Sequence, residues 1–338
     1  MPNILDNKQI DNNFERKSFS QLFENELRTK LSSLEEIRLE VRKKSIKFYA
    51  LVISSIIFCV IIYNFFGIGF SIISGVALAI FLFLMVNSLN EQKNLYISEY
   101  KNNIIKKMVE NMGTTFEYSP NSSLSLNEYY ESRIFEHEVD RFHGEDMITG
   151  KIDKTVIKFS EMHTEYKKEY RDSKGNKRTE WITIFKGILF IADFNKEFSH
   201  YVLVLPDYAE RAFGKFGQLL QSLGTKFSDK ELVKMENVEF EKLFAVYSPD
   251  QVEARYILTP LMMEKLVEFR NKVGKDIYVS FNNSNVYFAV PFNEDLFEPS
   301  VWYSVLDPAP LAQYYQVIKI MVDIVEQLNL NTRIWTKE

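Results

Sequence analysis

An uncharged apolar run is the feature that most constrains what this chain can fold into. From Phe48 through Asn90 no side chain is charged, which gives about 40 residues where about 20 suffice to cross a bilayer core. The glycines of FFGIGF, Phe65 to Phe70, divide the run into near-equal halves and permit a tight reversal. We therefore predict a transmembrane helical hairpin over residues 48–89, with spans at about 48–66 and 70–89.

Two alternatives to a membrane hairpin are weaker. A buried helical hairpin of a soluble protein would not need two adjacent uncharged spans. A cleavable signal peptide would begin earlier, would be shorter, and would end in a small-residue cleavage pattern.

Basic residues flank the run on both sides and predict its orientation. Five precede the first span, four follow the second, and the turn between the spans is uncharged. By the positive-inside rule both termini are then cytoplasmic, and the protein is multi-pass. These residues are Arg38, Arg42, Lys43, Lys44, Lys47, Lys93, Lys101, Lys106 and Lys107.

The segments next to the run have helical periodicity. Residues 19–47 place apolar side chains at near-heptad spacing, and residues 90–113 place them about every fourth position up to Gly113, a plausible helix stop. We predict two helices that pair as a coiled-coil stalk. The alternative is that the first helix packs on the globular domain or lies on the lipid surface. Residues 1–18 are polar and are expected to form a flexible N-terminus.

Residues 114–338 predict a cytoplasmic α+β domain with mainly antiparallel strands. TVIKFSEMHTEYKKEY and TEWITIFKGILFIADF flank a polar, glycine-bearing turn, which is typical of a long hairpin. AERAFGKFGQLLQSLG predicts an amphipathic helix closed by Gly224, and PLAQYYQVIKIMVDIVEQLNLN predicts a closing helix.

Composition and missing motifs narrow the function classes. A net charge of −5 gives no reason to expect nucleic-acid binding. The single cysteine, Cys59, makes neither an internal disulfide nor a cysteine metal cluster. The phosphate loop, nucleophile elbow, HExxH and GxGxxG motifs are all missing. The sequence predicts no cofactor and no metal, and it disfavours an enzyme.

The stretch FEHEVDRFHGED, from Phe135 to Asp146, gathers two of the four histidines among carboxylates. His137 and His143 are six positions apart, so a helix turns them in different directions and a strand separates them by about 20 Å. The spacing favours His137 and Arg141 as helix neighbours. We predict a polar network or partner surface that includes His137, Arg141, His143 and Asp146, rather than a metal site.

A second cluster lies in DQVEARYIL. Glu253 and Arg255 are too close in sequence to face each other on a helix, so each is expected to meet a partner elsewhere. Arg255 fits an ion pair better than an anionic ligand. His163 stands beside Glu161 and Glu165 on one strand face, which is typical of a solvated sheet face, with a pH-responsive contact as the alternative.

Four segments of the chain resemble a known family. They are RIFEHEVDRFHGEDMITGKI, KGILFIADFNKEFSHYVLVLPD, SPDQVEARYILTPLMMEKL and LNLNTRIWTK. From about Ser98 to the C-terminus the chain is similar to the bacterial domain-of-unknown-function 3137 (DUF3137) family, whose usual layout includes an N-terminal membrane hairpin. The resemblance implies a protein of the bacterial cytoplasmic (inner) membrane. It also implies a LemA-type membrane protein as a partner, and it assigns no activity or catalytic residue.

The expected function is that of a membrane-anchored interaction or scaffold protein, whose cytoplasmic domain binds a protein partner or a second copy. A lipid- or small-ligand-binding module is the alternative, because an aromatic-rich antiparallel domain can enclose an apolar pocket. A membrane-tethered hydrolase is the least favoured reading.

Overall fold

The computed structural model describes residues 19–194, 197–207 and 231–328, and the chain divides into two compact units. The sheet unit contains Val109–Leu296 and the chain from Gln313 onward. The helical unit contains the described residues 19–108 together with Phe297–Ala312. The predicted helix that ends at Gly224 lies outside the described residues.

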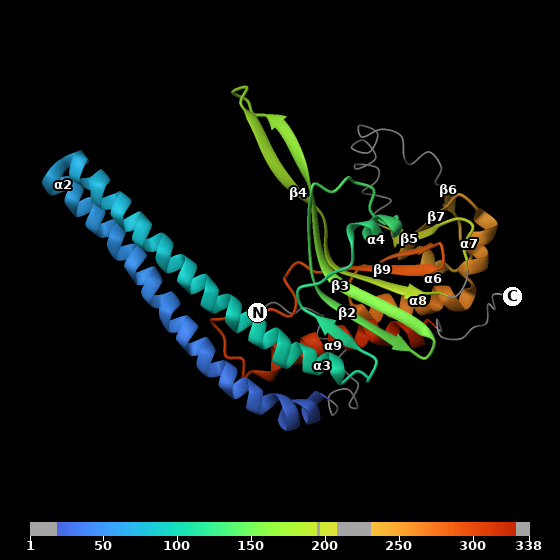
Figure 1. Ribbon diagram of the computed structural model, residues 1–338. Helices are drawn as coiled ribbons and strands as arrows, with labels where there is room; N and C mark the ends of the chain where they lie inside the picture. Colours follow the sequence, from blue (N-terminus) through green and yellow to red (C-terminus); the bar gives the residue numbers. More distant parts are fainter. Residues whose placement is uncertain (1–18, 195–196, 208–230, 329–338) are drawn as a thin grey trace. The chain divides into compact units, whose positions relative to one another are not determined.

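One long apolar helix, α2 (Arg28–Tyr100), dominates the helical unit. The π-helical turn η2 (Phe23–Leu27) precedes it, and η3 (Lys101–Ile105) and α3 (Lys106–Glu110) follow it. At Gly67 the backbone leaves the helical region, with φ 77° and ψ −177°, a conformation that glycine adopts without steric cost. The limbs before and after Gly67 run alongside each other (Figure 1), and Lys44 Nζ donates a hydrogen bond to Gln92 Oε1 at 2.7 Å.

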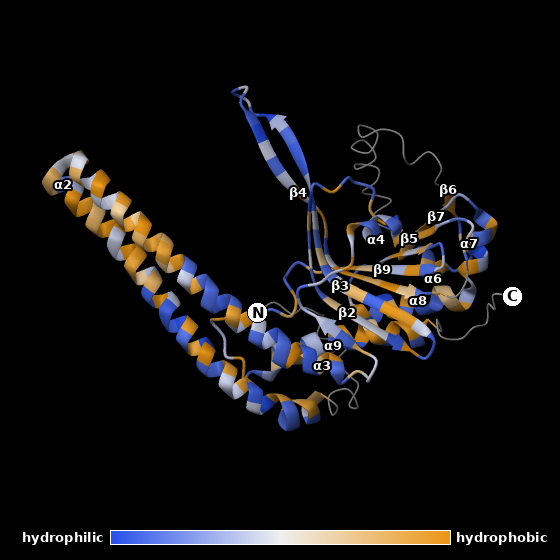
Figure 2. Ribbon diagram, in the orientation of Figure 1, coloured by the Kyte–Doolittle hydropathy of each residue, from blue (hydrophilic) through white to orange (hydrophobic). Residues whose placement is uncertain are grey.

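The apolar part of α2 is not covered by the rest of the described chain. Its most apolar 18-residue window has a mean hydropathy of 2.5, and none of that window is buried. Figure 2 shows hydrophobic residues concentrated around the reversal and polar residues toward the two ends. The helix is long and apolar enough to cross a membrane. The predicted apolar helical region is therefore found as one long helix, and its division into two membrane spans stays a prediction.

The sheet unit is built on a nine-stranded sheet of order β1-β2-β3-β4-β9-β8-β5-β7-β6. Every pairing in it is antiparallel, which confirms the predicted α+β class. The strands are β1 (Glu117–Ser119), β2 (Arg141–Ile152), β3 (Thr155–Arg171), β4 (Lys177–Asp193), β5 (Val202–Pro206), β6 (Glu231–Val233), β7 (Phe244–Ser248), β8 (Tyr278–Asn282) and β9 (Asn285–Pro291).

Helices pack on both faces of this sheet. On one face, Tyr129 of α4 (Leu126–Glu131) joins a buried cluster with Leu189 and Ile191 of β4. On the other, Phe269 of α8 (Pro260–Val273) packs edge-on against Phe288, which contacts Phe190 of β4. Because successive strand residues point to opposite faces, β4 is apolar at consecutive positions here. The remaining helices are α6 (Val238–Glu241), α7 (Gln251–Ile257) and α9 (Pro308–Gln327).

The hairpin of β3 and β4, predicted from the sequence, is confirmed and extends past its neighbours. Pairing of β2 with β3 begins at Glu165, and pairing of β4 with β9 begins at Gly187. Beyond these positions, among the described residues, the two strands pair only with each other. They form a projecting two-stranded ribbon, Tyr166–Ile182, which is called the arm below (Figure 1).

Candidate functional site

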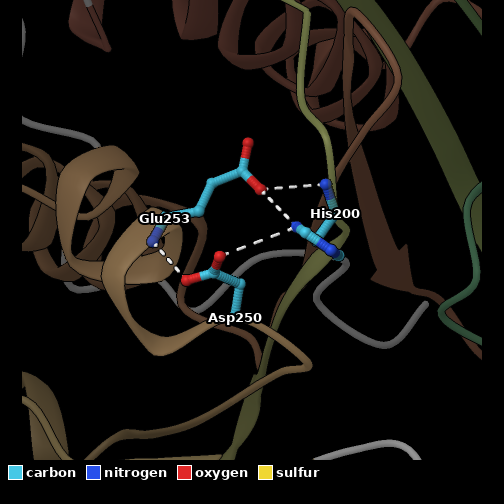
Figure 3. A group of neighbouring side chains, drawn as sticks. All are labelled: His200, Asp250 and Glu253. Carbon is cyan, nitrogen blue, oxygen red and sulfur yellow. Dashed lines mark hydrogen bonds and ion pairs between the residues drawn. The ribbon is translucent and has the colours of Figure 1, made fainter.

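Three polar residues meet where the chain enters β5, and they come from two segments (Figure 3). His200 lies just before β5, whereas Asp250 and Glu253 lie at the start of α7. Asp250 is the N-cap of this helix, and its carboxylate accepts hydrogen bonds from the N–H groups of Val252 (2.8 Å) and Glu253 (3.0 Å). The cap satisfies donors that the first helical turn leaves without partners.

Glu253 ties α7 to the chain before β5. Its Oε1 accepts from the backbone N–H of Ser199 at 2.8 Å, and its Oε2 accepts from that of His200 at 2.9 Å. The Nδ1 atom of His200 lies 3.1 Å from the same Oε2 and 3.8 Å from Asp250 Oδ2. Hydrogen bonds to a carboxylate are stronger than neutral ones, so this side chain fixes two segments that are about fifty residues apart in sequence.

The same three side chains have the composition of a cation site. Their ligand atoms lie within 4.8 Å of one another, and imidazole with two carboxylates suits zinc or manganese. Both oxygens of Glu253, however, already accept backbone N–H groups. Each bond already joins the helix to the chain before β5, so the present geometry is that of a helix cap and an inter-segment tie.

Sequence reasoning named Glu253 but missed His200 and Asp250. Asp250 was detectable, because an aspartate directly before an amphipathic helix is an N-terminus signal. His200 was not, because its partners lie far along the chain.

Arg255 and Glu253 have separate partners, as predicted. The Arg255 guanidinium donates to the backbone oxygen of Gln251 and to that of Lys234, both at 3.3 Å. Within the part of the chain that the structure describes, these acceptors are neutral, so the predicted ion pair is not found there.

Arg255 lines an open pocket of about 360 Å³. The other lining residues are Met235, Glu236, Asn237, Leu258, Pro260 and Met263.

The stretch from Phe135 to Asp146 enters strand β2 at Arg141, so the expected helical pairing of His137 with Arg141 is wrong. His137 precedes the strand and stacks on Tyr166, with ring centroids 4.7 Å apart. Partial burial lowers the pKa of His137. The Arg141 guanidinium lies over the ring of Trp181, 3.4 Å from its centroid, a cation–π contact at the base of the arm.

The two histidines of this stretch are not brought to one site. His143 Nε2 lies 3.6 Å from Glu145 Oε1, and in the strand register His143 is opposite His163. His163 Nε2 is 3.1 Å from Thr183 Oγ1 and 3.9 Å from Glu165 Oε1. These contacts describe a polar sheet surface.

Asp146 and Glu161 are buried carboxyl groups rather than surface ones. Asp146 sits at an irregularity in the β2–β3 register with φ 58°, is 1% exposed, and accepts a hydrogen bond from the Tyr118 hydroxyl. Glu161 is 5% exposed and accepts from the backbone N–H of Leu296 at 2.9 Å. The interpretation of Glu161 as part of a solvated sheet face is therefore wrong.

Burial raises the pKa of Glu161 to about 8, and the nearby carboxylates of Asp146, Asp295 and Glu145 act in the same direction. The Leu296 N–H opposes this shift but does not overcome it. Desolvation disfavours the charged carboxylate more than one backbone donor stabilises it.

Fold and polar clusters together define an α+β protein with a long apolar helix and an antiparallel sheet. Residues 183–330 match the family model described as "Protein of unknown function (DUF3137)". This match confirms the resemblance predicted from the sequence. It begins at residue 183, whereas the predicted resemblance began near Ser98.

The other comparisons add little. No curated protein matches the chain. Among solved structures, the crystal structure of the mycobacterial trehalose monomycolate transport factor A, TtfA, matches with 10% sequence identity and a TM-score of 0.35. The match covers 67% of this chain and 94% of that one. A likeness this distant carries no functional argument.

Replacing Glu253 with alanine should destabilise the sheet unit. The substitution removes the carboxylate acceptor of the exposed Ser199 and His200 N–H groups, which water can replace in part, so it is expected to cost about 1–2 kcal/mol of unfolding free energy. Chemical denaturation of the purified protein in detergent measures this. Glu239→Ala, at an exposed glutamate in α6, is the matched control and should change stability by less than about 0.5 kcal/mol. Equal effects of the two variants would contradict the structural role of Glu253.

Glu161→Gln should make the folded protein less sensitive to alkaline pH. The folded pKa of about 8 lies above the ordinary value of 4.5, so the folded state binds this proton more tightly and loses stability as pH rises through that window. The glutamine keeps an acceptor for Leu296 but does not ionise. We expect it to be more stable than the wild type by roughly 2–4 kcal/mol near pH 8, and little different below about pH 4.5.

Thermal unfolding of both proteins across this pH range checks the Glu161 prediction. The control is Glu264→Gln, at an exposed glutamate of α8, which should leave the wild-type pH profile unchanged. Parallel profiles for Glu161→Gln and the wild type would show that the Glu161 carboxyl does not titrate in this window.

Proposed function

We propose that this protein is a membrane-anchored interaction module. The observation that carries the anchor is the uncharged part of α2, with a mean hydropathy of 2.5 in a window that is wholly unburied. A folded protein in water rarely leaves so large an apolar surface uncovered. The change of backbone direction at Gly67 supports two antiparallel spans, residues 48–66 and 70–89, over a single longer one.

The charge pattern supports the orientation that we propose for these spans. Lys44 and Gln92 are hydrogen bonded across the two limbs. Lysines and an arginine lie within a few positions of these two residues in the sequence. The reversal at Phe65–Phe70 is uncharged. We infer that both chain termini lie on the cytoplasmic side of a bacterial membrane, with the reversal on the other side.

The arm supports the interaction function. Between Tyr166 and Ile182 it has six lysines or arginines and three acidic residues, in a chain whose net charge is −5. Within the described residues, no ion-pair partner is found for Lys168, Arg171 or Lys174. A basic projection with an exposed aromatic ring, Tyr170 at 47%, fits an acidic protein surface.

The partner that we propose is accordingly a membrane-associated protein with an acidic face. A LemA-type membrane protein and a second copy of this chain are the candidates raised by the sequence. Electrostatic attraction of this kind raises the association rate and selects the partner more than it adds affinity.

A small-ligand-binding module is the second candidate function, and the pocket beside Arg255 is the observation that favours it. Its walls combine apolar side chains with one cationic group, Arg255, one acidic group, Glu236, and the amide of Asn237, a mostly apolar lining with a few polar groups that is typical of small-molecule sites. Arg255 is already hydrogen bonded to Gln251 and Lys234, so an anion would compete with these bonds. We therefore place this function after the interaction function.

The anchor is tested by cysteine accessibility in intact cells and in permeabilised ones. In a Cys59→Ser background, single cysteines are placed by Lys43→Cys, Ile68→Cys and Gln92→Cys. A membrane-impermeant maleimide should label the Ile68→Cys protein from outside, and the other two only after permeabilisation. Labelling of all three from the same side would contradict two spans, and release of the wild type by alkaline carbonate would contradict a membrane anchor.

The interaction function is tested by site-specific photocrosslinking in intact membranes. A photoreactive residue at Tyr170, in the arm, should give a discrete crosslinked product, whereas one at Tyr256 of α7 should not. Tyr256 is 48% exposed and is thus matched to Tyr170 at 47%. The triple variant Lys168→Glu, Arg171→Glu, Lys174→Glu should abolish the product, because it repels an acidic partner. Persistence of the product in that variant would rule out charge recognition by the arm.

A further inference from the structure

Of the chain between β9 and α9, the part from Phe297 onward belongs to the helical unit, where it contacts Arg38 of one limb of α2 and Tyr96 of the other. Lys101 Nζ pairs with Glu298 Oε1 at 2.7 Å, near the start of the segment. Near its end, the backbone N–H of Val305 donates to Glu35 Oε2 at 3.1 Å. Residues Phe297–Asp307, here called the return segment, are thus held at both ends by charged side chains.

The middle of the return segment is held by a buried arginine. Arg38 is 3% exposed, and its Nε and Nη2 donate to the two carboxylate oxygens of Glu35 at 2.9 and 2.6 Å. Its Nη1 donates to the backbone oxygen of Val301 at 2.8 Å. The Tyr96 hydroxyl, from the other limb, donates to the oxygen of Ser300 at 3.3 Å. A bidentate arginine–carboxylate pair is a rigid support, so the path of this backbone is fixed.

Trp302 and Tyr303 are called the tip of the return segment below. The contacts of the segment place this tip nearest the apolar run. Val305 is held at Glu35, whereas Trp302 stacks on Tyr49, with ring centroids 6.2 Å apart and planes at 30°. The fourteen positions from Glu35 to Tyr49 correspond to about 21 Å along a helix. Tyr49 is the second residue of the uncharged run. The return segment therefore runs along the limbs of α2 to the boundary of the uncharged run, and it then runs back toward Glu35.

The tip exposes aromatic rings at this boundary. Trp302 is 46% exposed, Tyr303 is 59% exposed, and Tyr49 beside them is 54% exposed. The hydroxyl of Ser300 accepts hydrogen bonds from the N–H groups of Trp302 (3.1 Å) and Tyr303 (3.4 Å). The local turn and the Arg38 support together hold the rings in place. Tryptophan and tyrosine concentrate at the headgroup level of membranes, because each ring is apolar and bears a polar group.

We propose that Trp302 and Tyr303 are a second membrane contact, which sits in the lipid headgroup layer beside the two spans. The proposal rests on the membrane anchor described above. It commits to lipid because the exposed rings are continuous with the uncharged run through Tyr49. The contact fixes how deep the helical unit sits, and it fixes the chain just before α9 at the membrane surface.

Depth-dependent quenching of tryptophan fluorescence tests this contact in the full-length protein. The variant Trp181→Phe, Trp335→Phe leaves Trp302 as the single tryptophan, and it is reconstituted into phosphatidylcholine vesicles with brominated acyl chains. Bromines near the headgroup should quench Trp302 strongly, and bromines near the chain ends should quench it weakly. Trp302 fluorescence that no brominated lipid quenches would overturn the proposal.

Two further single-tryptophan proteins separate this proposal from the membrane anchor. Phe58→Trp, in a background with all three native tryptophans replaced by phenylalanine, reports on the span itself and should be quenched by deep bromines. If it is quenched and Trp302 is not, the anchor stands and the second contact fails. If neither is quenched, the anchor fails. A protein with Lys30→Trp as its single tryptophan, at an exposed position about 27 Å along the helix from Phe48, is the unquenched control.

Arg38→Ala tests whether the return segment depends on its arginine support. In the Trp302-only protein this substitution removes the donor to Val301 and the partner of Glu35. We expect loss of the shallow quenching of Trp302, while Phe58→Trp in the same Arg38→Ala background stays quenched. Unchanged quenching of Trp302 would show that the rings are held at the membrane without this support.

Discussion

An uncharged helical run that the protein does not bury is the constraint on which the rest of the helical unit depends. The limbs of α2 have buried side chains only outside that run, for example Leu31, Leu34 and Tyr96. Charged residues that organise contacts, such as Arg38 and Lys101, are likewise confined to the flanks. The helix thus has a part that packs on protein and a part whose apolar surface the rest of the described chain leaves uncovered.

Several polar groups of the protein join segments that are distant in sequence. Glu253 holds the chain before β5, and Glu161 receives the N–H of Leu296. Arg38 and Glu35 hold the return segment in the other unit. In each case a charged or ionisable side chain satisfies backbone groups that no helix or sheet satisfies, which is the requirement for burying irregular backbone.

Sequence periodicity was sufficient to predict those helices and strands that are determined by neighbouring residues in the chain. The uncharged run predicted the apolar helix, and alternation around the Gly175 turn predicted the β3–β4 hairpin, because both patterns are contained in one continuous segment. The entry into β2 was missed. His137 and Arg141 satisfy helical spacing, whereas pairing of Arg141 with Glu165 of β3 decides the outcome, and the hairpin partner lies beyond a local window.

The candidate site was less predictable than the fold, for the same physical reason. Glu161 alternates in step with the buried Ile157 and Phe159, and its contact with Leu296, 135 positions away, supplies the hydrogen-bond donor for a carboxyl in the interior. Asp146 is directed inward by a left-handed backbone conformation, φ 58°, at an irregularity in the strand register. Neither feature has a signature in residue type or spacing. His200 joins Asp250 and Glu253 only through the folded arrangement of β5 and α7.

The place of the return segment in the chain has a consequence for the order of assembly. It interrupts the sheet unit in sequence, since β9 precedes it and the greater part of α9 follows it. A chain made from its N-terminus completes α2 about 200 residues before Trp302 leaves the ribosome, at roughly 5–20 residues per second. Both limbs therefore exist for at least several seconds before their partner segment does. The sheet unit receives its last helix only afterwards, so both limbs of α2 are made before the sheet unit can be completed.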